Sequence, residues 1–351
     1  MSRRYAVLAP GHFAEDAKTA HGVIAYSPDA TVAVIDGTLA GKRVGDVAPH
    51  LKSDAPIVAS VREALALKPT ALLVGVAPRG GGLPADWRAM ILEAIAAKLE
   101  IVSGLHDMLG EDPEFAAAAK AAGTTIWDVR KPPATPIFQG EVYKVNAPTV
   151  LLVGNDCAVG KMTVALELCR GAERAGKRAA FVPTGQTGIM IAGWGIAIDR
   201  VIADFAPGAT EALVLHAAKD DPDMIFVEGQ GSINHPAYAP VTLALMYGSA
   251  PDRLILVVDP VRPRIQSYVT PTLGYKELIR LHEELIATVK PARFIGVALN
   301  TRHLSDEQAA AEIARAEAET GLPADDVVRN GPDKLYAAIV PGLGKERPCG
   351  G

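Results

Sequence analysis

Short apolar runs of strand length alternate along the chain with stretches in which apolar residues recur every three or four positions. The short runs predict buried strands of a parallel sheet, and the longer stretches predict the helices that cover it. In the first part of the chain we expect strands at 5–9, 31–36, 71–77, 100–103 and 125–129, and helices at 60–67, 84–98 and 113–122. This alternation predicts a small Rossmann-like parallel α/β domain over residues 1–130.

The same alternation resumes after a proline-rich passage. Four prolines between residues 131 and 148 disfavour helix, so this passage is expected to be a linker. Beyond it we expect strands at 149–154, 178–182, 224–228, 253–259 and 293–298, and helices at 161–175, 238–249, 272–288 and 305–320. Residues 149–351 are therefore expected to form a second α/β domain of the P-loop NTPase-like type.

The strand at 149–154 leads directly into a loop of the phosphate-binding kind. Such a loop turns backbone N–H groups toward a phosphate, adds the partial positive charge of a helix N-terminus and supplies one lysine. We expect the cofactor phosphates to bind the loop and the first helical turn, which comprise Asn155, Asp156, Cys157, Ala158, Val159, Gly160, Lys161, Met162 and Thr163.

Two features of this loop depart from the common pattern. Its glycines, Gly154 and Gly160, are separated by one extra residue, and Met162 stands where a serine or threonine hydroxyl would bind Mg²⁺. Thr163, one position later, is a partial substitute for that hydroxyl. The thiol of Cys157 at a helix N-terminus is a second candidate for chemistry, as a nucleophile, although a tight loop favours a small side chain in any case. The loop thus predicts phosphate binding without requiring phosphate cleavage.

Ligands of parallel sheets bind beyond the carboxyl ends of the strands, and three such ends carry candidate residues. Glu228 follows one strand and is either a general base or a Mg²⁺ ligand, with helix capping as the structural alternative. His235 and Asp204 are weaker candidates for the base. The residues expected to contact the substrate or a developing oxyanion are Thr184, Gln186, Thr187, Gly229, Gln230, Gly231 and Ser232.

The third strand end carries Asn300, whose amide is suited to reading an adenine edge. Arg262 follows another strand and is suited to binding a carboxylate through two parallel hydrogen bonds, although a surface salt bridge is equally compatible with the sequence.

Composition narrows the classes of partner. The formal net charge is −5 and no lysine or arginine cluster occurs, so nothing indicates a nucleic-acid surface. No apolar run approaches the roughly 20 residues of a membrane span, and no segment resembles a signal peptide. The three cysteines have neither a metal-ligand nor a disulfide spacing. We expect a cytoplasmic protein that binds small molecules.

These motifs together carry a family resemblance. The loop at 154–161, the Val227-Glu228-Gly229 stretch and Asn300 look like the dethiobiotin synthetase branch of P-loop proteins, which depends on ATP and Mg²⁺. The longer motifs, at 155–163, 183–193, 204–205 and 228–236, resemble a narrower P-loop family long known only as a domain of unknown function. A D-glutamate N-acetyltransferase that uses acetyl-CoA has been described in that family, and the resemblance spans most of the chain.

The resemblance implies an N-acetyltransferase that moves the acetyl group of acetyl-CoA to the amino group of an acidic D-amino acid, a reaction for which no metal is required. Arginine is then expected to hold the substrate carboxylates, with Arg262 as the first candidate and Arg302 and Arg130 as the others. Two alternatives remain open, namely an ATP- and Mg²⁺-dependent ligase or carboxylase and a non-catalytic nucleotide sensor. Exposed helices of an α/β sheet often pair, so we expect a homodimer.

Overall fold

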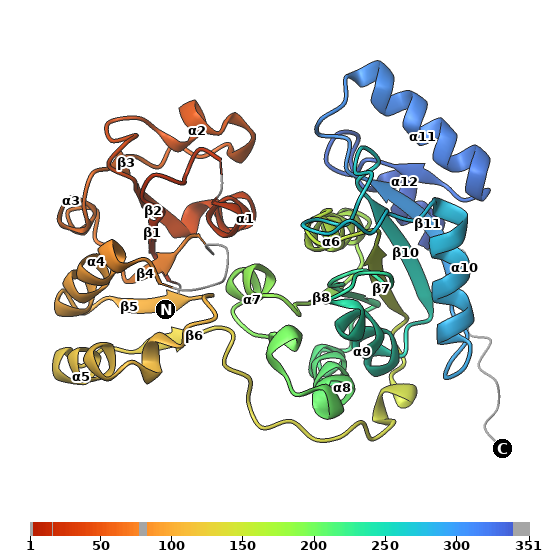
Figure 1. Cartoon of the computed structure of the whole chain (residues 1–351), viewed down its shortest axis with the longest axis horizontal. Coiled ribbons are helices and arrows are strands. Elements are labelled where there is room, and N and C mark those ends of the chain that lie inside the picture. The colour runs from red at the N-terminus through yellow and green to blue at the C-terminus, as the bar shows by residue number, and fades with distance from the viewer. Residues whose placement is uncertain (1–2, 16, 77–82, 340–351) are drawn as a thin grey trace. The chain divides into compact units, whose positions relative to one another are not determined.

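The computed structural model of the protein describes residues 3–15, 17–76 and 83–339, and it divides the chain into two compact units (Figure 1). The first unit contains the chain up to Pro132 together with Gln186–Arg200, and the second contains Pro133–Gly185 and the chain from Val201 onward. Both units are parallel α/β structures, which confirms the predicted fold class. The sequence analysis placed residues 186–200 in the second domain, whereas they belong to the first unit. The end of the predicted second domain, 340–351, lies outside the described residues.

The first unit is built on a parallel six-stranded sheet with the strand order β3-β2-β1-β4-β5-β6. Its strands are β1 (Tyr5–Leu8), β2 (Thr31–Ile35), β3 (Ile57–Val58), β4 (Ala71–Val74), β5 (Glu100–Ser103) and β6 (Ile126–Asp128). Its α-helices are α1 (Lys18–Tyr26), α2 (Val44–Val47), α3 (Val61–Leu65), α4 (Ala85–Ala96), α5 (Pro113–Ala122) and α7 (Gln186–Ala192). Helix α7 belongs here because it packs against α1, far away in sequence.

The second unit contains another parallel six-stranded sheet, with the order β12-β11-β10-β7-β9-β8. Its strands are β7 (Thr149–Gly154), β8 (Ala179–Val182), β9 (Met224–Val227), β10 (Arg253–Val258), β11 (Arg293–Leu299) and β12 (Ala324–Asp325). Its α-helices are α6 (Lys161–Arg174), α8 (Ala206–Ala218), α9 (Ala239–Ser249), α10 (Tyr275–Ile286), α11 (Asp306–Thr320) and α12 (Asp333–Ile339).

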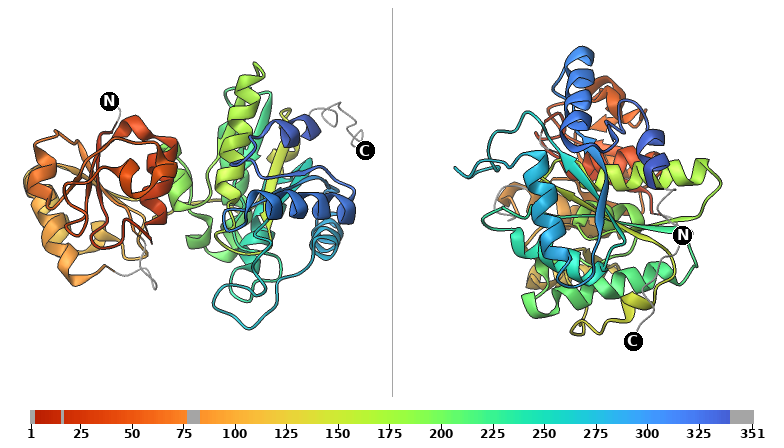
Figure 2. Two further views of the ribbon diagram at one scale, coloured as in Figure 1. Left: turned by 90° about the horizontal axis from the view of Figure 1, so that it is seen from above. Right: turned by 90° about the vertical axis from the view of Figure 1, so that its right-hand side faces the viewer.

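Helices cover both faces of this second sheet (Figure 2). Val150 and Leu152 of β7 pack in one apolar cluster with α6 and α12. Side chains alternate along a strand, so Leu151 and Val153 face the other side, and they too are buried. Helices α8, α9 and α10 contact the sheet through β8, β9, β7 and β11. A sheet buried on both faces leaves its carboxyl edge as the place for a ligand.

The strand order fixes which loops meet at that edge. Strand β7 lies between β9 and β10, so the phosphate loop after β7 has Glu228 on one side and Asp259 on the other.

Within the described ranges, no helix is long and apolar enough to cross a membrane.

Candidate phosphate-binding site

The phosphate loop requires glycine at both of its ends, Gly154 and Gly160. A Cβ on Gly154 would lie 2.8 Å from the carbonyl oxygen of Val257, and Gly160 has φ +110°. Ala158 has φ +56°, a left-handed conformation that costs a non-glycine residue about 1 kcal/mol or more. Gly160 precedes α6 and gives it no side-chain cap, an arrangement typical of helix N-termini that bind an anion through their N–H groups.

Lys161 ties the phosphate loop to the loop that follows β9. Its Nζ donates to the carbonyl oxygen of Asp156 at 2.6 Å and to that of Gly231 at 2.8 Å. The side chain is buried, so its charge acts in a region where water screens poorly. The lysine is therefore already oriented at the phosphate loop by main-chain carbonyls.

Two side-chain amides that were predicted to contact the cofactor, those of Asn155 and Asn300, hold the loop in place. Asn155 Nδ2 donates to the Asp259 carbonyl oxygen, and Asp259 N–H donates to Asn155 Oδ1, both at 3.1 Å. Asn300 Nδ2 donates to the carbonyl oxygen of Val159 at 3.1 Å. These bonds link β7 to β10 and the loop to β11. The part of Asn300 in reading adenine stays a prediction, since its amide nitrogen is used in positioning the loop.

Asp156 is fully buried and joins the phosphate loop to the segment after β10. Its Oδ1 accepts from Cys157 N–H at 2.6 Å, and its Oδ2 accepts from Gln266 N–H at 2.7 Å and from Arg262 Nη1 at 2.8 Å. Arg262 also donates to the Cys157 carbonyl oxygen and pairs with Asp259. Arg262, the first candidate for the substrate carboxylate, is thus mainly occupied by the protein's own carboxylates.

Glu228 lies directly after β9 and is mostly buried, with 7% of its surface exposed. Its Oε2 accepts hydrogen bonds from the N–H groups of Thr184 and Gly185, both at 3.0 Å. Its backbone carbonyl oxygen accepts from the Thr184 hydroxyl at 2.8 Å. The next residue must be glycine, because a Cβ on Gly229 would lie 1.6 Å from the carbonyl oxygen of Leu152. The carboxylate is therefore held rigidly beside the phosphate loop, with both N–H donors on one of its oxygens.

His235 is buried next to Asp156, and its hydrogen bonds define its tautomer. Its Nδ1 accepts from the N–H groups of Ala237 and Tyr238, at 3.1 and 3.2 Å, so the ring proton lies on Nε2. Burial lowers the pKa of His235, as does Lys161, while Asp156 opposes them. A neutral ring with its proton on Nε2 is a hydrogen-bond donor toward the loop. This geometry does not suit the general base considered from the sequence.

The tautomer also bears on metal binding. Asp156 Oδ1, Cys157 Sγ and His235 Nε2 lie within 4.8 Å of one another, a spacing that suits a cation. A metal-bound imidazole normally donates its other ring N–H, whereas Nδ1 of His235 accepts two hydrogen bonds. Nε2 therefore lacks the lone pair that a metal needs. Mg²⁺ is also poorly served, because the residue after Lys161 is Met162, which offers no oxygen.

The remaining predicted residues of the second unit have separate surroundings. Gln230 Nε2 donates to the Thr184 carbonyl oxygen at 2.6 Å, and the Ser232 hydroxyl donates to Asn234 Oδ1 at 2.9 Å, so both belong to the Glu228 loop. Arg302 is exposed and its Nε bonds to the ring of His303. Asp204 is exposed in a 3-10 turn, and among the described residues no hydrogen bond or ion pair joins it to the phosphate loop.

Three predicted substrate residues belong to the first unit. Gln186 Nε2 and the Thr187 hydroxyl, at the start of α7, lie 3.4 and 3.5 Å from the hydroxyl of Thr19. Arg130 pairs with Asp199 and donates through Nε to the Gly104 carbonyl oxygen at 2.8 Å. Their role in substrate binding stays a prediction.

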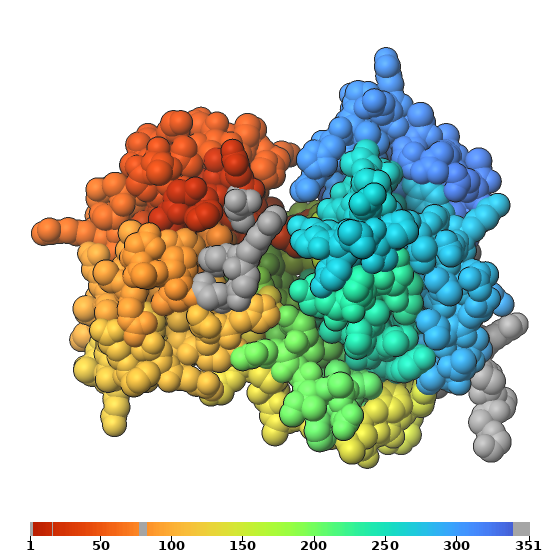
Figure 3. Space-filling model, in the orientation of Figure 1, coloured from red at the N-terminus to blue at the C-terminus, as the bar shows by residue number. Residues whose placement is uncertain are grey.

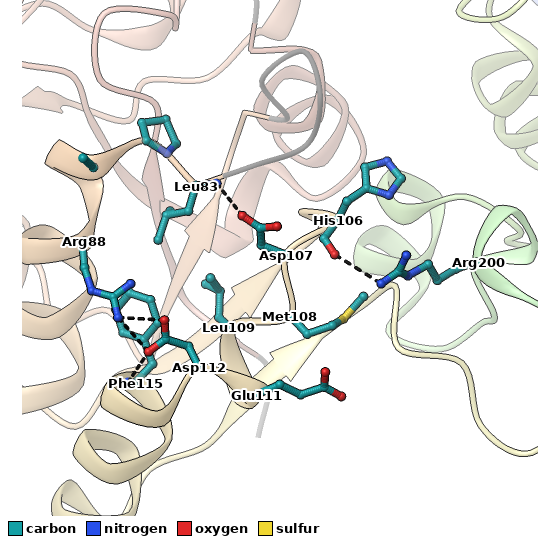
Figure 4. Close-up of a pocket in the computed structure, with 12 residues that line it drawn as sticks. Leu83, Arg88, His106, Asp107, Met108, Leu109, Glu111, Asp112, Phe115 and Arg200 are labelled. Carbon is teal, nitrogen blue, oxygen red and sulfur yellow. Dashed lines mark hydrogen bonds and ion pairs between the residues drawn. The ribbon is translucent and has the colours of Figure 1, made fainter.

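The first unit also contains a cavity of about 600 Å³ beyond the carboxyl end of β5 (Figure 4). Arg88 on its wall forms an ion pair with Asp112 at 2.7 Å, and Arg200 donates to the His106 carbonyl oxygen at 3.5 Å. None of the predicted site residues lines this cavity. The phosphate loop of the second unit is therefore the stronger candidate site.

The fold and this loop define a two-domain P-loop α/β protein. Residues 136–336 match the P-loop domain, and residues 37–132 the Rossmann-like domain, of a family described as a domain of unknown function, DUF1611. The chain belongs to this family. The resemblance identified from the sequence motifs is thereby confirmed.

Relatives and a solved structure match nearly the whole chain. A protein of Tritonibacter scottomollicae named D-glutamate N-acetyltransferase is 36% identical over 92% of this chain and 94% of its own length. A protein of the same name from Pseudoalteromonas sp. is 36% identical over 80% of this chain and 84% of its own. The crystal structure of a DUF1611 family protein from Anabaena variabilis is 38% identical and covers 97% of this chain and 99% of its own, with a TM-score of 0.91.

Proposed function

We propose that this protein is an N-acetyltransferase that moves the acetyl group of acetyl-CoA to the amino group of an acidic D-amino acid such as D-glutamate. The observation that carries the proposal is the buried carboxylate of Glu228, which follows β9, the strand next to β7, and accepts hydrogen bonds from the N–H groups of Thr184 and Gly185. The names of two relatives, each 36% identical to this chain, support the reaction and the class of acceptor.

In this proposal the phosphate loop binds the cofactor without cleaving it. The N–H groups at the start of α6 and the ammonium of Lys161 bind the phosphates of CoA. Met162 supplies no hydroxyl for Mg²⁺, which a kinase or ligase needs for its transition state. An acyl transferase loses nothing by that change, because its phosphates only anchor the cofactor.

The acetyl transfer is a direct attack by the substrate amine. Glu228 takes a proton from the substrate ammonium, and the freed amine attacks the carbonyl carbon of the thioester. N–H groups between Gly229 and Ser232 stabilise the oxyanion of the tetrahedral intermediate. The carbon–sulfur bond then breaks, CoA leaves as its thiolate and takes up a proton, and the N-acetyl amino acid is released. Arg302 and Arg262 are the candidate partners for the substrate carboxylates.

The test is to incubate the protein with acetyl-CoA and a panel of D- and L-amino acids while following free-thiol release. We expect release with acidic D-amino acids and N-acetylated product by mass spectrometry. ATP hydrolysis with Mg²⁺ and no thiol release would instead establish the ligase alternative. We also propose a cytoplasmic homodimer, which light scattering of the purified protein and fractionation of its host cells would test.

A further inference from the structure

Two exposed tyrosines converge on the buried ring of His235. The ring of Tyr238 lies 4.5 Å from the imidazole, between centroids, at a tilt of 34°, and the ring of Tyr268 lies at 5.2 Å, nearly perpendicular. Tyr238 precedes α9, whereas Tyr268 belongs to the segment after β10. We call these two side chains the tyrosine pair.

The tyrosine pair is fixed on one side by its contacts with the protein and is exposed to solvent on the other. His235 cannot rotate freely, because its Nδ1 accepts from the N–H groups of Ala237 and Tyr238. Tyr268 N–H donates to the Ile265 carbonyl oxygen, next to Gln266, which binds Asp156 of the phosphate loop. Yet 49% of Tyr238 and 41% of Tyr268 remain exposed. Figure 3 shows this part of the chain, in teal to cyan, at the surface of the second unit.

Exposed aromatic rings beside a phosphate loop suit a ligand with an anionic end and a partly apolar arm. Rings offer flat apolar surface at little cost in conformational entropy, and their hydroxyls bond amides. In the described part of the chain, no hydrogen bond engages the hydroxyl of Tyr238 or of Tyr268. His235 Nε2 lies 3.8 Å from Asp156 Oδ1, so the tyrosine pair is continuous with the loop.

The direction of the arm follows from the strand order. Phosphates bound at the loop after β7 divide CoA into an adenosine half and a pantetheine half, and the half that reaches Glu228 must carry the thioester. Glu228 and Tyr238 both belong to the segment that links β9 to α9, while Asn300 holds the loop from the β11 side. The tyrosine pair therefore combines one ring, Tyr238, from the segment that follows Glu228 with one ring, Tyr268, from the segment that follows Asp259 on the other side of the phosphate loop.

We infer that the tyrosine pair binds the pantetheine arm of the acyl-CoA, with the rings against its gem-dimethyl group and the hydroxyls near its amides. This inference rests on the proposed function, since it takes CoA as the ligand of the loop. It assigns Tyr238 and Tyr268 to cofactor binding, a role that no motif in the sequence predicts.

Isothermal titration with two probes tests the inference without turnover. The probes are CoA and 3′-phosphoadenosine 5′-diphosphate, which is CoA without its pantetheine arm. We expect wild-type protein to bind CoA more tightly. Tyr238→Ala and Tyr268→Ala should each weaken CoA binding about 5- to 30-fold, as truncation of a well-packed tyrosine does, and leave the fragment within about twofold. Lys161→Ala should weaken both probes.

The matched control is Tyr143→Ala, which removes a tyrosine of similar exposure, 44%, that packs on Phe138 instead. It should leave both affinities unchanged. Equal losses for CoA and for the fragment would place the adenosine half on the rings and overturn the inference. Equal wild-type affinity for the two probes would also overturn it. Absence of CoA binding to wild-type protein would overturn the proposed function itself, and the inference with it.

Discussion

Replacing Glu228 by glutamine separates the basicity of this side chain from its structural role. Both N–H donors, from Thr184 and Gly185, bind the same oxygen, Oε2. A glutamine can place its own oxygen there and keep both hydrogen bonds, while its NH₂ group takes the position of the other oxygen. Each bond to a neutral acceptor is about 1 kcal/mol weaker than to a charged one, so we expect the weakening of these two bonds to lower the free energy of unfolding by about 2 kcal/mol.

Activity should change far more than stability. A general base contributes a factor of about 10² to 10⁴, so kcat of Glu228→Gln should fall by that factor while the affinity for CoA is kept. The assay is free-thiol release at saturating acetyl-CoA and D-glutamate, with CoA affinity measured by titration calorimetry. Turnover near that of wild type would refute the assignment of the base. Dependence of the wild-type reaction on Mg²⁺, with loss on chelation, would make Glu228 a metal ligand.

Glu211 provides a matched control, in which the same substitution should affect stability and leave kcat unchanged. It is also a buried carboxylate with two backbone donors, but Gln139 N–H binds its Oε2 at 2.7 Å and Val142 N–H binds its Oε1 at 3.1 Å. In Glu211→Gln one of these N–H groups must face an NH₂ group, which costs about 1–3 kcal/mol. We therefore expect Glu211→Gln to be the less stable variant and to retain kcat. The reverse order of stabilities would show that the donor geometry is misassigned.

Three further changes test other parts of the second unit. Lys161→Ala should raise KM for acetyl-CoA about 10- to 150-fold, which corresponds to about 1.5–3 kcal/mol, with a smaller effect on kcat. The exposed Lys177→Ala should change neither. Unchanged CoA affinity in Lys161→Ala would place the phosphates elsewhere. Gly229→Ala should lower the free energy of unfolding by about 3 kcal/mol, because the new Cβ would clash with Leu152. Gly274→Ala is the control: a Cβ there meets nothing within 4 Å, so the loss should be about 1 kcal/mol or less. Urea denaturation would measure both changes. Burial lowers the pKa of His282 to about 4, whereas the pKa of a histidine in the unfolded chain is near 6.5. The unfolded chain therefore binds a proton first as pH falls, and the free energy of unfolding should decrease by about 2 kcal/mol between pH 7 and pH 5. His282→Leu should abolish this decrease. An unaltered pH dependence in that variant would contradict the reasoning.

Elements with local signals could be predicted from the sequence closely. The helix expected at 113–122 begins and ends at those residues, because Asp112 caps its first turn and Gly123 ends it in a left-handed conformation. The strands expected at 100–103 and 149–154 also have these bounds, since each is a short apolar run with polar or glycine residues beside it.

Elements that depend on contacts between distant parts of the chain could not be predicted from the sequence. Helix α8 was missed because it is buried nearly all round and so lacks the apolar periodicity of an amphipathic helix. Its Gly208 shows what covers it, since a Cβ there would lie 2.0 Å from the Pro136 carbonyl oxygen of the proline-rich passage. The transfer of residues 186–200 to the first unit likewise depends on contacts with Thr19, more than 160 positions away.

In the candidate site too, features with a local sequence signal could be predicted, and features that depend on distant contacts could not. The loop at 154–161 and Glu228 could be placed from the sequence because each follows an apolar strand. The link between Asp156 and Arg262 could not, since it depends on the neighbouring positions of β7 and β10 in the sheet. The convergence of Tyr238 and Tyr268 on His235 had no sequence signal either, because the two rings come from different segments.

The internal bonding of the phosphate loop bears on what the loop is suited to do. In a nucleotide-cleaving site, a metal ion and positioned cations stabilise the charge that develops on the transferred phosphoryl group. Here Lys161 is bonded to two main-chain carbonyls, Arg262 is bonded to Asp156 and Asp259, and Met162 offers no metal ligand. The loop therefore offers a lysine and N–H groups for binding a phosphate, but neither a metal ligand after Lys161 nor an unpaired Arg262 for the charge of phosphoryl transfer. That arrangement agrees with the proposed acyl transferase, in which the reacting bond is at the far end of the cofactor, beside Glu228.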